Sequence, residues 1–521
     1  MRPELITPHR VKASAVHPSA WLFLNVQHRT LFAGFYGVLL AGMAVVSAVL
    51  TLQSLRWPLI HDAPLMHYIA WLIQTGSVPY RDIFDMNAPG TYLVHLGALL
   101  LFGHSDFGMR LFDLATLAVM TGLIIHLGRS FGPWSGTTAA LLFWLFHLSG
   151  GAWRAGQRDY LASLFLLASL VPIWQEGIGP FRVAGAFGWL GAAALIKPHV
   201  TAFAVLLGAA LLARREDSFP RGQRVKLAGW AILGFSLPVA AVVTWLAVAG
   251  GLLPFWELLR DYLIPLYSRL GRAPLVEAVR WQVLGWETLT LVAALALLAS
   301  FSLLAMKRWS RRHTILVLGV FYGLFHFWVQ GKGWEYHLYP LSLFGILLGT
   351  SAIDQRLALP QLPSKLIEIS LVALLTLTLA VKGVWALDAP WIVKKERRVG
   401  EIVSFFEPRV TPGVTVQVLD TTEGGIHALF RMGLRQPTRF LYDFHFYHDI
   451  GHPVIERLRK ELVARLDQKP PTFVLAFQDN WLRHDFSRFD EFPELNTLLT
   501  RRYRLLREAD GYRIYEKLGD S

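Results

Sequence analysis

Residues 31–50 read LFAGFYGVLLAGMAVVSAVL and contain no charged side chain. A helix needs about 20 apolar residues to cross the hydrocarbon core of a bilayer, so this stretch is long enough to span. The preceding residues 1–30 are polar and basic, and they are too long for the first part of a cleavable signal peptide. The sequence therefore predicts an uncleaved signal anchor that follows a cytoplasmic N-terminal tail.

The whole chain is rich in apolar residues. Of its 521 residues, 54% are hydrophobic and 17% are charged, whereas soluble proteins average about 25% charged residues. The net charge of +13 does not arise in residues 387–521, which hold about 21 Lys and Arg against about 20 Asp and Glu. The excess lies in the membrane part, where basic residues follow topology, so it does not indicate nucleic-acid binding. The absence of cysteine excludes disulfides, thiolate metal sites and a cysteine nucleophile.

Apolar windows of membrane-crossing length recur along the chain. They predict a mainly α fold, a polytopic membrane helical bundle of about 11 transmembrane helices. The segment 89–103 is apolar but short, which favours a juxtamembrane or re-entrant helix. The predicted spans are 31–51, 110–128, 135–149, 161–175, 182–196, 199–213, 227–249, 285–306, 314–329, 338–353 and 366–386.

Basic residues give the bundle an orientation. With residues 1–30 in the cytoplasm, the inner loops hold about 17 Lys and Arg and the longer outer loops about 11, as the positive-inside rule requires. The clusters at 214–226 and 307–312 carry most of this bias. An odd number of spans then places the C-terminal residues outside the cytoplasm, on the same side as the first outer loop, residues 52–109.

Residues 387–521 have the pattern of a small extracytoplasmic α/β domain. Residues 414–419 and 472–477 read as strands and residues 453–467 as a helix. Asp510-Gly511 reads as a hairpin turn.

Three histidines lie close together in residues 445–452, which read HFYHDIGH. On a helix they would share one face, as zinc ligands do. Gly451 and Pro453 interrupt such a helix, so loop packing or contact with an acceptor is the alternative.

The first outer loop carries charged residues next to the membrane. Residues 61–68 read HDAPLMHY, and residues 76–92 read GSVPYRDIFDMNAPGTY. Carboxylates held near lipid are costly and usually functional. This singles out Asp62, Asp82 and Asp85 as candidate site residues.

Residues 76–92, together with an acidic residue just after the first span, resemble the GT-C superfamily of glycosyltransferases, especially the protein O-mannosyltransferase and aminoarabinose (lipid A) transferase group. The resemblance covers roughly residues 31–345. It implies a GT-C-like catalytic membrane domain, residues 31–386, that takes a sugar from a polyprenyl phosphate at the outer face of a bacterial inner membrane. By position, Asp62 would act as general base or position the acceptor. Many relatives have an Asp-Glu pair there, whereas Ala63 follows Asp62 here.

A second resemblance lies at residues 155–160, AGQRDY, after the third span. Relatives place an acidic residue in the second outer loop, opposite the first across the active site, and Asp159 matches that position. The predicted topology independently places Asp159 on the same side as Asp62. If a divalent metal (Mg, Mn or Zn) takes part, these two carboxylates are the expected ligands, because hard cations prefer carboxylate oxygen. Relatives divide on metal use.

The expected reaction needs a base for the acceptor's proton and cations for the charge that develops on the leaving phosphate. Lys197, before a proline, and Lys332, between two glycines, interrupt apolar stretches. Such sites are typical of broken helix ends that line a cavity. The predicted phosphate- and donor-binding residues are Arg81, Arg158, Lys197, Lys332 and His337, and the predicted loop or acceptor contacts are Tyr80, Asp82, Asp85, Asn87 and Tyr336.

Several of these residues also have a structural explanation. Asp62 is suited to cap the helix that follows it. Asp82 and Asp85 are suited to fix the loop by turn hydrogen bonds or by pairing with Arg81. Lys197 is suited to reach the membrane interface with its long side chain.

The leading hypothesis is an inverting membrane glycosyltransferase, hexosyl or pentosyl, whose partners are a polyprenyl-phosphate-linked sugar and a glycolipid, polysaccharide or protein acceptor. A transporter or flippase of lipid-linked sugars is the alternative, although the sequence shows no internal repeat of the kind that many transporters have. A structural protein that keeps the fold without activity is the third reading. The sequence leaves the sugar, the acceptor and the oligomeric state open.

Overall fold

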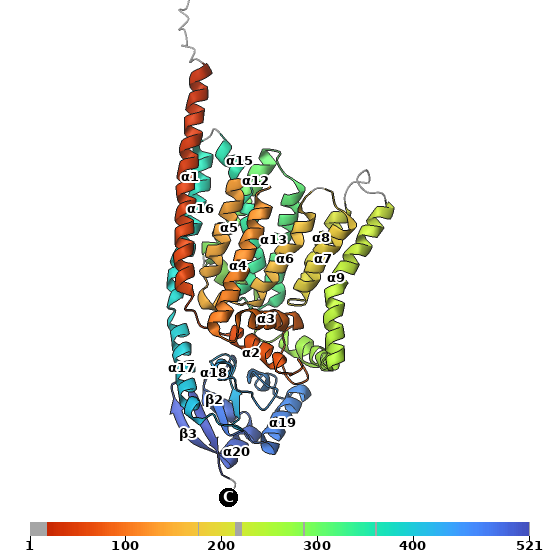
Figure 1. The fold of residues 1–521 in the computed structure, drawn as a ribbon, viewed down its shortest axis with the longest axis vertical. Coiled ribbons are helices and arrows are strands. Elements are labelled where there is room, and N and C mark those ends of the chain that lie inside the picture. The colour runs from red at the N-terminus through yellow and green to blue at the C-terminus, as the bar shows by residue number, and fades with distance from the viewer. Residues whose placement is uncertain (1–17, 176, 214–220, 285–286, 360–361, 520–521) are drawn as a thin grey trace, which may run out of the picture.

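A computed structural model describes residues 18–175, 177–213, 221–284, 287–359 and 362–519. Within these residues, each predicted span corresponds to one helix, and these helices stand roughly parallel in one bundle (Figure 1). They are α1 (Pro18–Ser54), α4 (Asp106–Gly128), α5 (Pro133–Leu148), α6 (Arg158–Trp174), α7 (Pro180–Ala194), α8 (Val200–Leu212), α9 (Arg221–Ala249), α12 (Glu287–Ala305), α13 (Arg311–Gln330), α14 (Tyr339–Thr350) and α16 (Leu362–Leu387).

Seven segments of the described chain are long and apolar enough to cross a membrane. The remaining bundle helices, α5 to α8, are each shorter than these segments. The chain is a multi-pass membrane protein, and the predicted fold class is confirmed.

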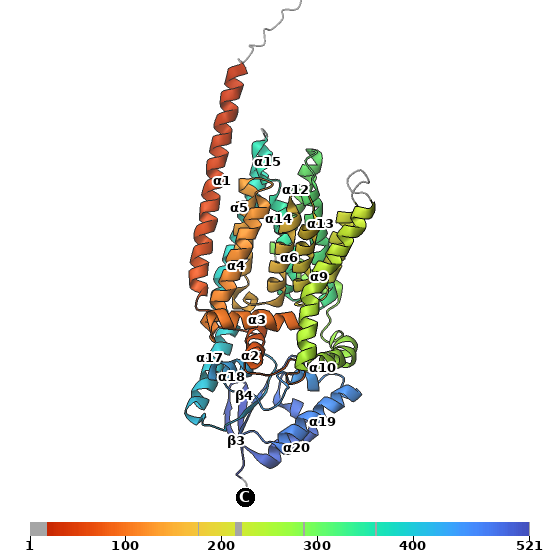
Figure 2. The ribbon, with the colours of Figure 1, turned by 45° about the vertical axis from the view of Figure 1, so that its right-hand side comes forward.

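Two short helices lie across one end of the bundle instead of along it. They are α2 (Asp62–Gln74) and α3 (Pro89–Phe102), and both sit between the bundle and the C-terminal domain (Figures 1 and 2). The segment 89–103 therefore lies across the end of the bundle, which agrees with the juxtamembrane alternative for this segment. Gly90 fixes α3 against the turn after α7, because its N–H donates to the carbonyl of Leu195 at 2.9 Å. A Cβ at Gly90 would lie 2.7 Å from that carbonyl carbon, so the contact requires glycine.

Further short helices complete the loops at this end of the bundle and at the opposite end. Those at the end facing the C-terminal domain include a π-helical segment, η3, which follows α10. The short helices are η1 (Gly151–Arg154), α10 (Leu252–Glu257), η3 (Leu258–Tyr267), α11 (Leu275–Leu284), η4 (Glu335–Leu338) and α15 (Ile353–Ala358).

The C-terminal domain has the predicted α/β composition. Its four-stranded sheet has the order β1-β2-β4-β3, with β1 parallel to β2 and the other pairs antiparallel. Both predicted strands, the predicted helix and the Asp510-Gly511 hairpin turn are present. The elements are β1 (Val416–Leu419), β2 (Phe473–Phe477), β3 (Tyr503–Ala509), β4 (Tyr512–Lys517), α17 (Pro390–Phe406), α18 (Gly425–Met432), α19 (Pro453–Gln468), α20 (Pro493–Arg502), η5 (Glu407–Arg409), η6 (Phe444–Phe446) and η7 (Phe486–Phe489).

The C-terminal domain shares a hydrophobic core with the first outer loop. Apolar side chains of α2 and α3 belong to the same buried cluster as those of β1 and β2. Tyr68 Oη donates to the carbonyl of Leu434 at 2.9 Å, and Phe84 N donates to the carbonyl of Arg439 at 2.8 Å. The domain is therefore docked on the bundle through α2 and the loop that follows it.

Two of the three histidines of residues 445–452 serve this docking. His445 Nδ1 and His448 Nε2 lie 2.5 Å and 2.9 Å from Tyr262 Oη, which comes from the membrane part. The segment forms η6 and a loop, and α19 begins only at Pro453. His445 and His448 thus pack at a loop contact, which was the alternative to a zinc-binding helix, whereas His452 is the N-cap of α19.

The contacts also support the predicted grouping of loops. The loops expected to share the outer side meet one another and the C-terminal domain at one end of the bundle. The basic turn expected on the inner side lies at the other end, where Arg312 Nε donates to the carbonyl of Trp174 at 3.1 Å. Which end faces the cytoplasm stays a prediction.

Candidate active site

A cavity of about 420 Å³ lies where the bundle meets the C-terminal domain. Its walls come from the first outer loop, the second outer loop, two further membrane loops and three segments of the C-terminal domain. The lining residues are His61, Asp62, Met86, Asn87, Trp153, Arg158, Tyr267, Trp334, Tyr336, Thr421, Thr422, Glu423, Tyr442, Phe444, Asp479, Asn480, Trp481 and His484. Four predicted site residues, Asp62, Asn87, Arg158 and Tyr336, are among them.

Asp62 is the first residue of α2, and its carboxylate faces the cavity. Arg158 Nη2 donates to Asp62 Oδ2 at 2.6 Å, and Tyr442 Oη donates to Asp62 Oδ1 at 3.2 Å. The capping alternative is wrong, because the N-cap of α2 is His61 and that cap has no side-chain hydrogen bond. The carboxylate is used by Arg158 and Tyr442 instead.

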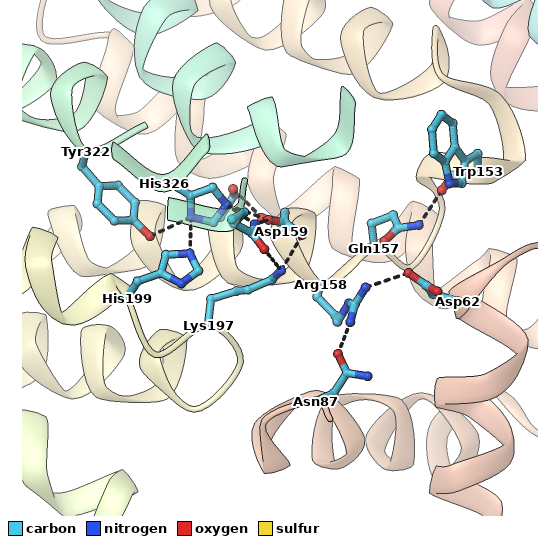
Figure 3. Close-up of polar contacts among 12 residues, drawn as sticks. Asp62, Asn87, Trp153, Gln157, Arg158, Asp159, Lys197, His199, Tyr322 and His326 are labelled. Carbon is cyan, nitrogen blue, oxygen red and sulfur yellow. Dashed lines mark hydrogen bonds and ion pairs between the residues drawn. The ribbon is translucent and has the colours of Figure 1, made fainter. Parts of the chain in front are cut away.

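The turn before α6 positions Arg158. Gly156 has φ +68°, a conformation that favours glycine, and its N–H donates to Asp113 Oδ1 at 2.9 Å. Arg158 then extends into the cavity, where it also donates to Asn87 Oδ1 (Figure 3). Its Nε atom is buried and has no hydrogen-bond partner among the described residues. One guanidinium therefore links the first and second outer loops and keeps a free donor.

Asp85 orders the part of the first outer loop that presents Asn87. Its Oδ1 accepts from Asn87 N at 2.9 Å, from Asn87 Nδ2 at 2.7 Å and from Tyr92 Oη at 2.5 Å. Tyr80 Oη donates to the carbonyl of Asn87 at 2.7 Å. Burial raises the pKa of Asp85, although the hydrogen bonds from Tyr92 and Asn87 act against that rise. Tyr80 and Asp85 support the cavity wall without lining it.

Asp159 points toward Lys197 and His326 (Figure 3) and does not line the cavity. Its Oδ1 lies 2.6 Å from His326 Nε2 and 2.5 Å from Gln330 Nε2, and Lys197 Nζ lies 3.1 Å from its Oδ2. Burial lowers the pKa of Lys197 to about 8, while the nearby Asp159 opposes that change. Asp62 and Asp159 are thus separated by Arg158, and each carboxylate already has its own basic partner.

Arg81 and Asp82 lie outside the cavity. Arg81 Nη2 is 2.8 Å from Asp82 Oδ2, and both side chains are exposed. The same carboxylate accepts from Val78 N at 2.8 Å. This pair therefore fixes a loop turn, which matches the structural explanation.

The predicted residues near η4 lie at different depths. Tyr336 lines the cavity, whereas His337 is buried beside it. Lys332 lies behind the wall: its Nζ donates to the carbonyl of Leu270 and sits 4.8 Å and 4.9 Å from the ring centroids of Tyr267 and Trp481. Burial lowers the pKa of Lys332 to about 8.

Most of the cavity's aromatic lining was not singled out from the sequence. The chain is aromatic throughout, so no local pattern distinguishes these rings from those that face lipid or the core. Of these rings, only Tyr336 was predicted as a site residue from the sequence. The aromatic lining residues are Trp153, Tyr267, Trp334, Tyr336, Tyr442, Phe444 and Trp481.

Solved structures resemble this arrangement closely enough to identify the fold. ArnT from Cupriavidus metallidurans in the apo state has a TM-score of 0.59 and 10% sequence identity, over 93% of this chain and 98% of that chain. The same protein bound to undecaprenyl phosphate gives 0.58 and 12%, over 97% and 99%. The chain has the GT-C fold.

A third solved structure agrees with this assignment. Arabinofuranosyltransferase AftD from Mycobacteria has a TM-score of 0.50 and 15% identity, and the match covers 92% of this chain and 41% of AftD. No family model matches the chain, and no curated protein matches it by sequence. At these identities the likeness establishes the GT-C fold alone.

Within the GT-C fold, another cluster meets the spacing of a metal site. Asp106, Glu396 and His427 offer ligand atoms that lie within 4.8 Å of one another. Arg431 already supplies a positive charge there, at 2.6 Å from Asp106 Oδ2 and 2.8 Å from Glu396 Oε1. The cluster therefore acts as an ionic contact that joins α4 to α17 and α18. The predicted metal ligands Asp62 and Asp159 do not converge on a shared point.

Proposed function

We propose that the chain is a membrane glycosyltransferase that moves a sugar from a polyprenyl phosphate to an acceptor hydroxyl. The observation that carries the proposal is a cavity at the membrane boundary in which a carboxylate, Asp62, and a guanidinium, Arg158, stand together. The GT-C fold supports it, since ArnT from Cupriavidus metallidurans has the same fold and has been seen bound to undecaprenyl phosphate. The proposed partners are a polyprenyl-phosphate-linked sugar and a glycolipid, polysaccharide or protein acceptor.

The proposed reaction is a single displacement. The acceptor oxygen attacks the anomeric carbon, the bond from that carbon to the phosphate oxygen breaks, and the lipid phosphate leaves with the electron pair. Asp62 takes the acceptor's proton as general base. One displacement inverts the configuration at the anomeric carbon.

Arg158 is the proposed phosphate ligand. Its Nε has no partner among the described residues, and its two Nη atoms contact Asp62 and Asn87. A phosphate oxygen competes for this guanidinium, because charge-assisted hydrogen bonds between arginine and phosphate are strong. Binding of the donor would therefore release Asp62 from its ion pair and make it available as a base.

Asp159 and Lys197 are proposed as positioning residues. Asp159 follows Arg158 in the first turn of α6, and its buried contacts with Lys197, His326 and Gln330 hold that turn in place. A shift of the turn would move Arg158 relative to Asp62.

The proposed location is the inner membrane of a bacterium. The N-terminus would face the cytoplasm, and the C-terminal domain would lie in the periplasm. The excess of Lys and Arg in the predicted inner loops over the predicted outer loops supports this orientation.

The proposal is tested in detergent, where no sealed membrane exists. Purified protein is incubated with synthetic undecaprenyl phosphate hexoses and pentoses and with a membrane extract as acceptor, and release of undecaprenyl phosphate is measured. Asp62→Asn should lower the rate by about 100-fold or more, the usual contribution of a general base. Asp82→Asn is the matched control in the same loop and should leave the rate unchanged.

Two results would overturn the proposal. One is an Asp62→Asn variant that transfers at the wild-type rate. The other is a wild-type protein that transfers no sugar in detergent but moves the lipid-linked sugar between leaflets of sealed vesicles, which would identify a flippase. Mass spectrometry of glycolipids from cells that lack the gene would identify the acceptor.

A further inference from the structure

Two of the three C-terminal-domain segments that line the cavity are loops that leave neighbouring strands. One follows β1 and contributes Thr421, Thr422 and Glu423, and the other follows β2 and contributes residues 479–481. Because β1 and β2 are parallel neighbours, with Leu419 opposite Ala476, their loops leave the same edge of the sheet. The carboxyl ends of this one parallel pair therefore bring both loops to the cavity.

Asn480 presents an unused hydrogen-bond donor at this edge. Its Oδ1 accepts from the backbone N–H groups of Leu482 and Arg483, each at 2.8 Å, so the side chain is fixed. Its Nδ2 is buried and has no partner among the described residues, while the residue, 5% exposed, lines the cavity. A buried donor without a partner is costly, so a ligand that accepts this hydrogen bond would satisfy the amide.

Trp481 stands next to that amide and continues an aromatic surface. Its ring centroid lies 5.7 Å from that of Trp334 and 5.4 Å from that of Phe444. The ring packs on Gly271 of the membrane part, where a Cβ would overlap with it. A polar amide beside flat aromatic faces suits a sugar ring, whose C–H face stacks on an aromatic ring while its hydroxyls form hydrogen bonds.

The charge of the cavity disfavours an anionic occupant. Among the described residues that line it, Arg158 is the one lysine or arginine, and the donor phosphate needs it. Burial lowers the pKa of His61 to about 4, so this histidine is neutral at physiological pH. Glu423 is already paired with Lys395 at 2.9 Å and Arg398 at 2.7 Å. A phosphorylated or otherwise acidic acceptor would find no second cation.

We infer that the loops after β1 and β2 form an acceptor subsite for a neutral carbohydrate ring, held by Asn480 and Trp481. The inference rests on the proposed function and specifies its acceptor. The ring belongs to the acceptor because the donor sugar must place its phosphate at Arg158 and its anomeric carbon beside Asp62. The acceptor ring then fills the part of the cavity that the C-terminal domain encloses.

The test uses the full-length protein in lauryldimethylamine oxide, because maltoside and glucoside detergents carry sugars that would compete. Fluorescently labelled protein is applied to an array of neutral, phosphorylated and sialylated glycans and of serine-containing peptides. Wild-type protein should bind neutral glycans in preference to the acidic glycans and the peptides. Asn480→Asp, which keeps the loop-forming Oδ1 but loses the N–H donor, and Trp481→Leu should each weaken this binding by about tenfold.

Matched variants separate recognition from folding. Trp481→Phe keeps an aromatic face and should bind nearly as well as wild type, and Asp82→Asn should be unaffected. All variants are checked for monodisperse elution and for binding of undecaprenyl phosphate, which should not change. If Trp481→Leu does not fold, Asn480→Asp alone decides the question.

Three outcomes would overturn the inference. The first is equal glycan binding by wild type, Asn480→Asp and Trp481→Leu. The second is a preference of the wild-type protein for acidic glycans or peptides. The third is that the variants lose binding of the donor sugar but keep binding of glycans. Failure of wild-type protein to bind undecaprenyl phosphate or to release it from a donor would instead count against the proposed function. The two failures are therefore distinguishable.

Discussion

Asp159→Asn removes one buried negative charge and preserves the shape of the side chain. Oδ1 of Asp159 holds His326 and Gln330, whereas Oδ2 faces Lys197 Nζ at 3.1 Å. An asparagine in the same rotamer keeps the Oδ1 contacts and turns an amide NH₂ toward the ammonium. The Asp159 side chain is fully buried and that of Lys197 is 10% exposed, so water cannot replace the lost charge.

The expected loss in the free energy of unfolding is about 3–5 kcal/mol, the usual effect of stranding one charge of a buried pair. It is measured by titration with sodium dodecyl sulfate in mixed micelles, followed by tryptophan fluorescence. Adding Lys197→Met removes the stranded charge, so the double variant should be more stable than Asp159→Asn alone.

Asp82→Asn supplies the control, because its pair with Arg81 is 38% and 49% exposed and exposed pairs contribute only about 0–1 kcal/mol. The reasoning would be refuted by an Asp159→Asn loss no larger than that of the control. It would equally be refuted if Lys197→Met destabilised the Asp159→Asn protein further.

Three other substitutions test separate features. Arg158→Lys keeps the positive charge, but a lysine cannot bind both Asp62 and Asn87. We therefore expect kcat/KM for release of undecaprenyl phosphate to fall by about 10- to 100-fold. An unchanged kcat/KM would contradict the phosphate-binding role of Arg158. Gly271 has φ +59° and lies against Trp481, whereas Gly433 has φ +63° and no neighbouring atom within 4 Å. Gly271→Ala should therefore lower the free energy of unfolding more than Gly433→Ala. Equal losses would show that overlap between the new Cβ and the Trp481 ring is not the cause. Burial, with Glu423 nearby, raises the pKa of Asp420 to about 6. The folded state then binds more protons than the unfolded state between about pH 4 and 6, so stability should fall by up to about 3 kcal/mol as pH rises through that window. Thermal unfolding of Asp420→Asn should lack this slope, and parallel curves for variant and wild type would show that Asp420 does not titrate there.

The membrane fold could be predicted because lipid imposes a local rule. Each span must be apolar along its own length, so a window such as 31–51 identifies its helix without knowledge of its neighbours. The strands at 414–419 and 472–477 were likewise visible as short apolar runs between turn residues.

The site could be predicted only where residues lie close along the chain. The sequence identified both Arg158 and Asp159, but consecutive residues of a helix point about 100° apart. Which of them faces the cavity depends on the packing of α6, so the expected pairing of Asp62 with Asp159 is replaced by the pairing of Asp62 with Arg158. Trp481 and Asn480 reach the cavity from more than 300 residues beyond Arg158 in the chain. No local pattern carries that information.

The hydrogen bond between Tyr68 and Leu434 joins residues that are 366 positions apart. Ribosomes synthesise about 5–20 residues per second, so the interval between synthesis of α2 and synthesis of the segment that covers it is on the order of 20–70 s. During that time the side chains of α2 that the C-terminal domain covers in the folded protein have only α3 and the rest of the membrane part as protein neighbours. A chain cut short before the C-terminal domain would thus expose the apolar side chains of α2 that this domain covers, and it should be degraded faster than the full-length chain.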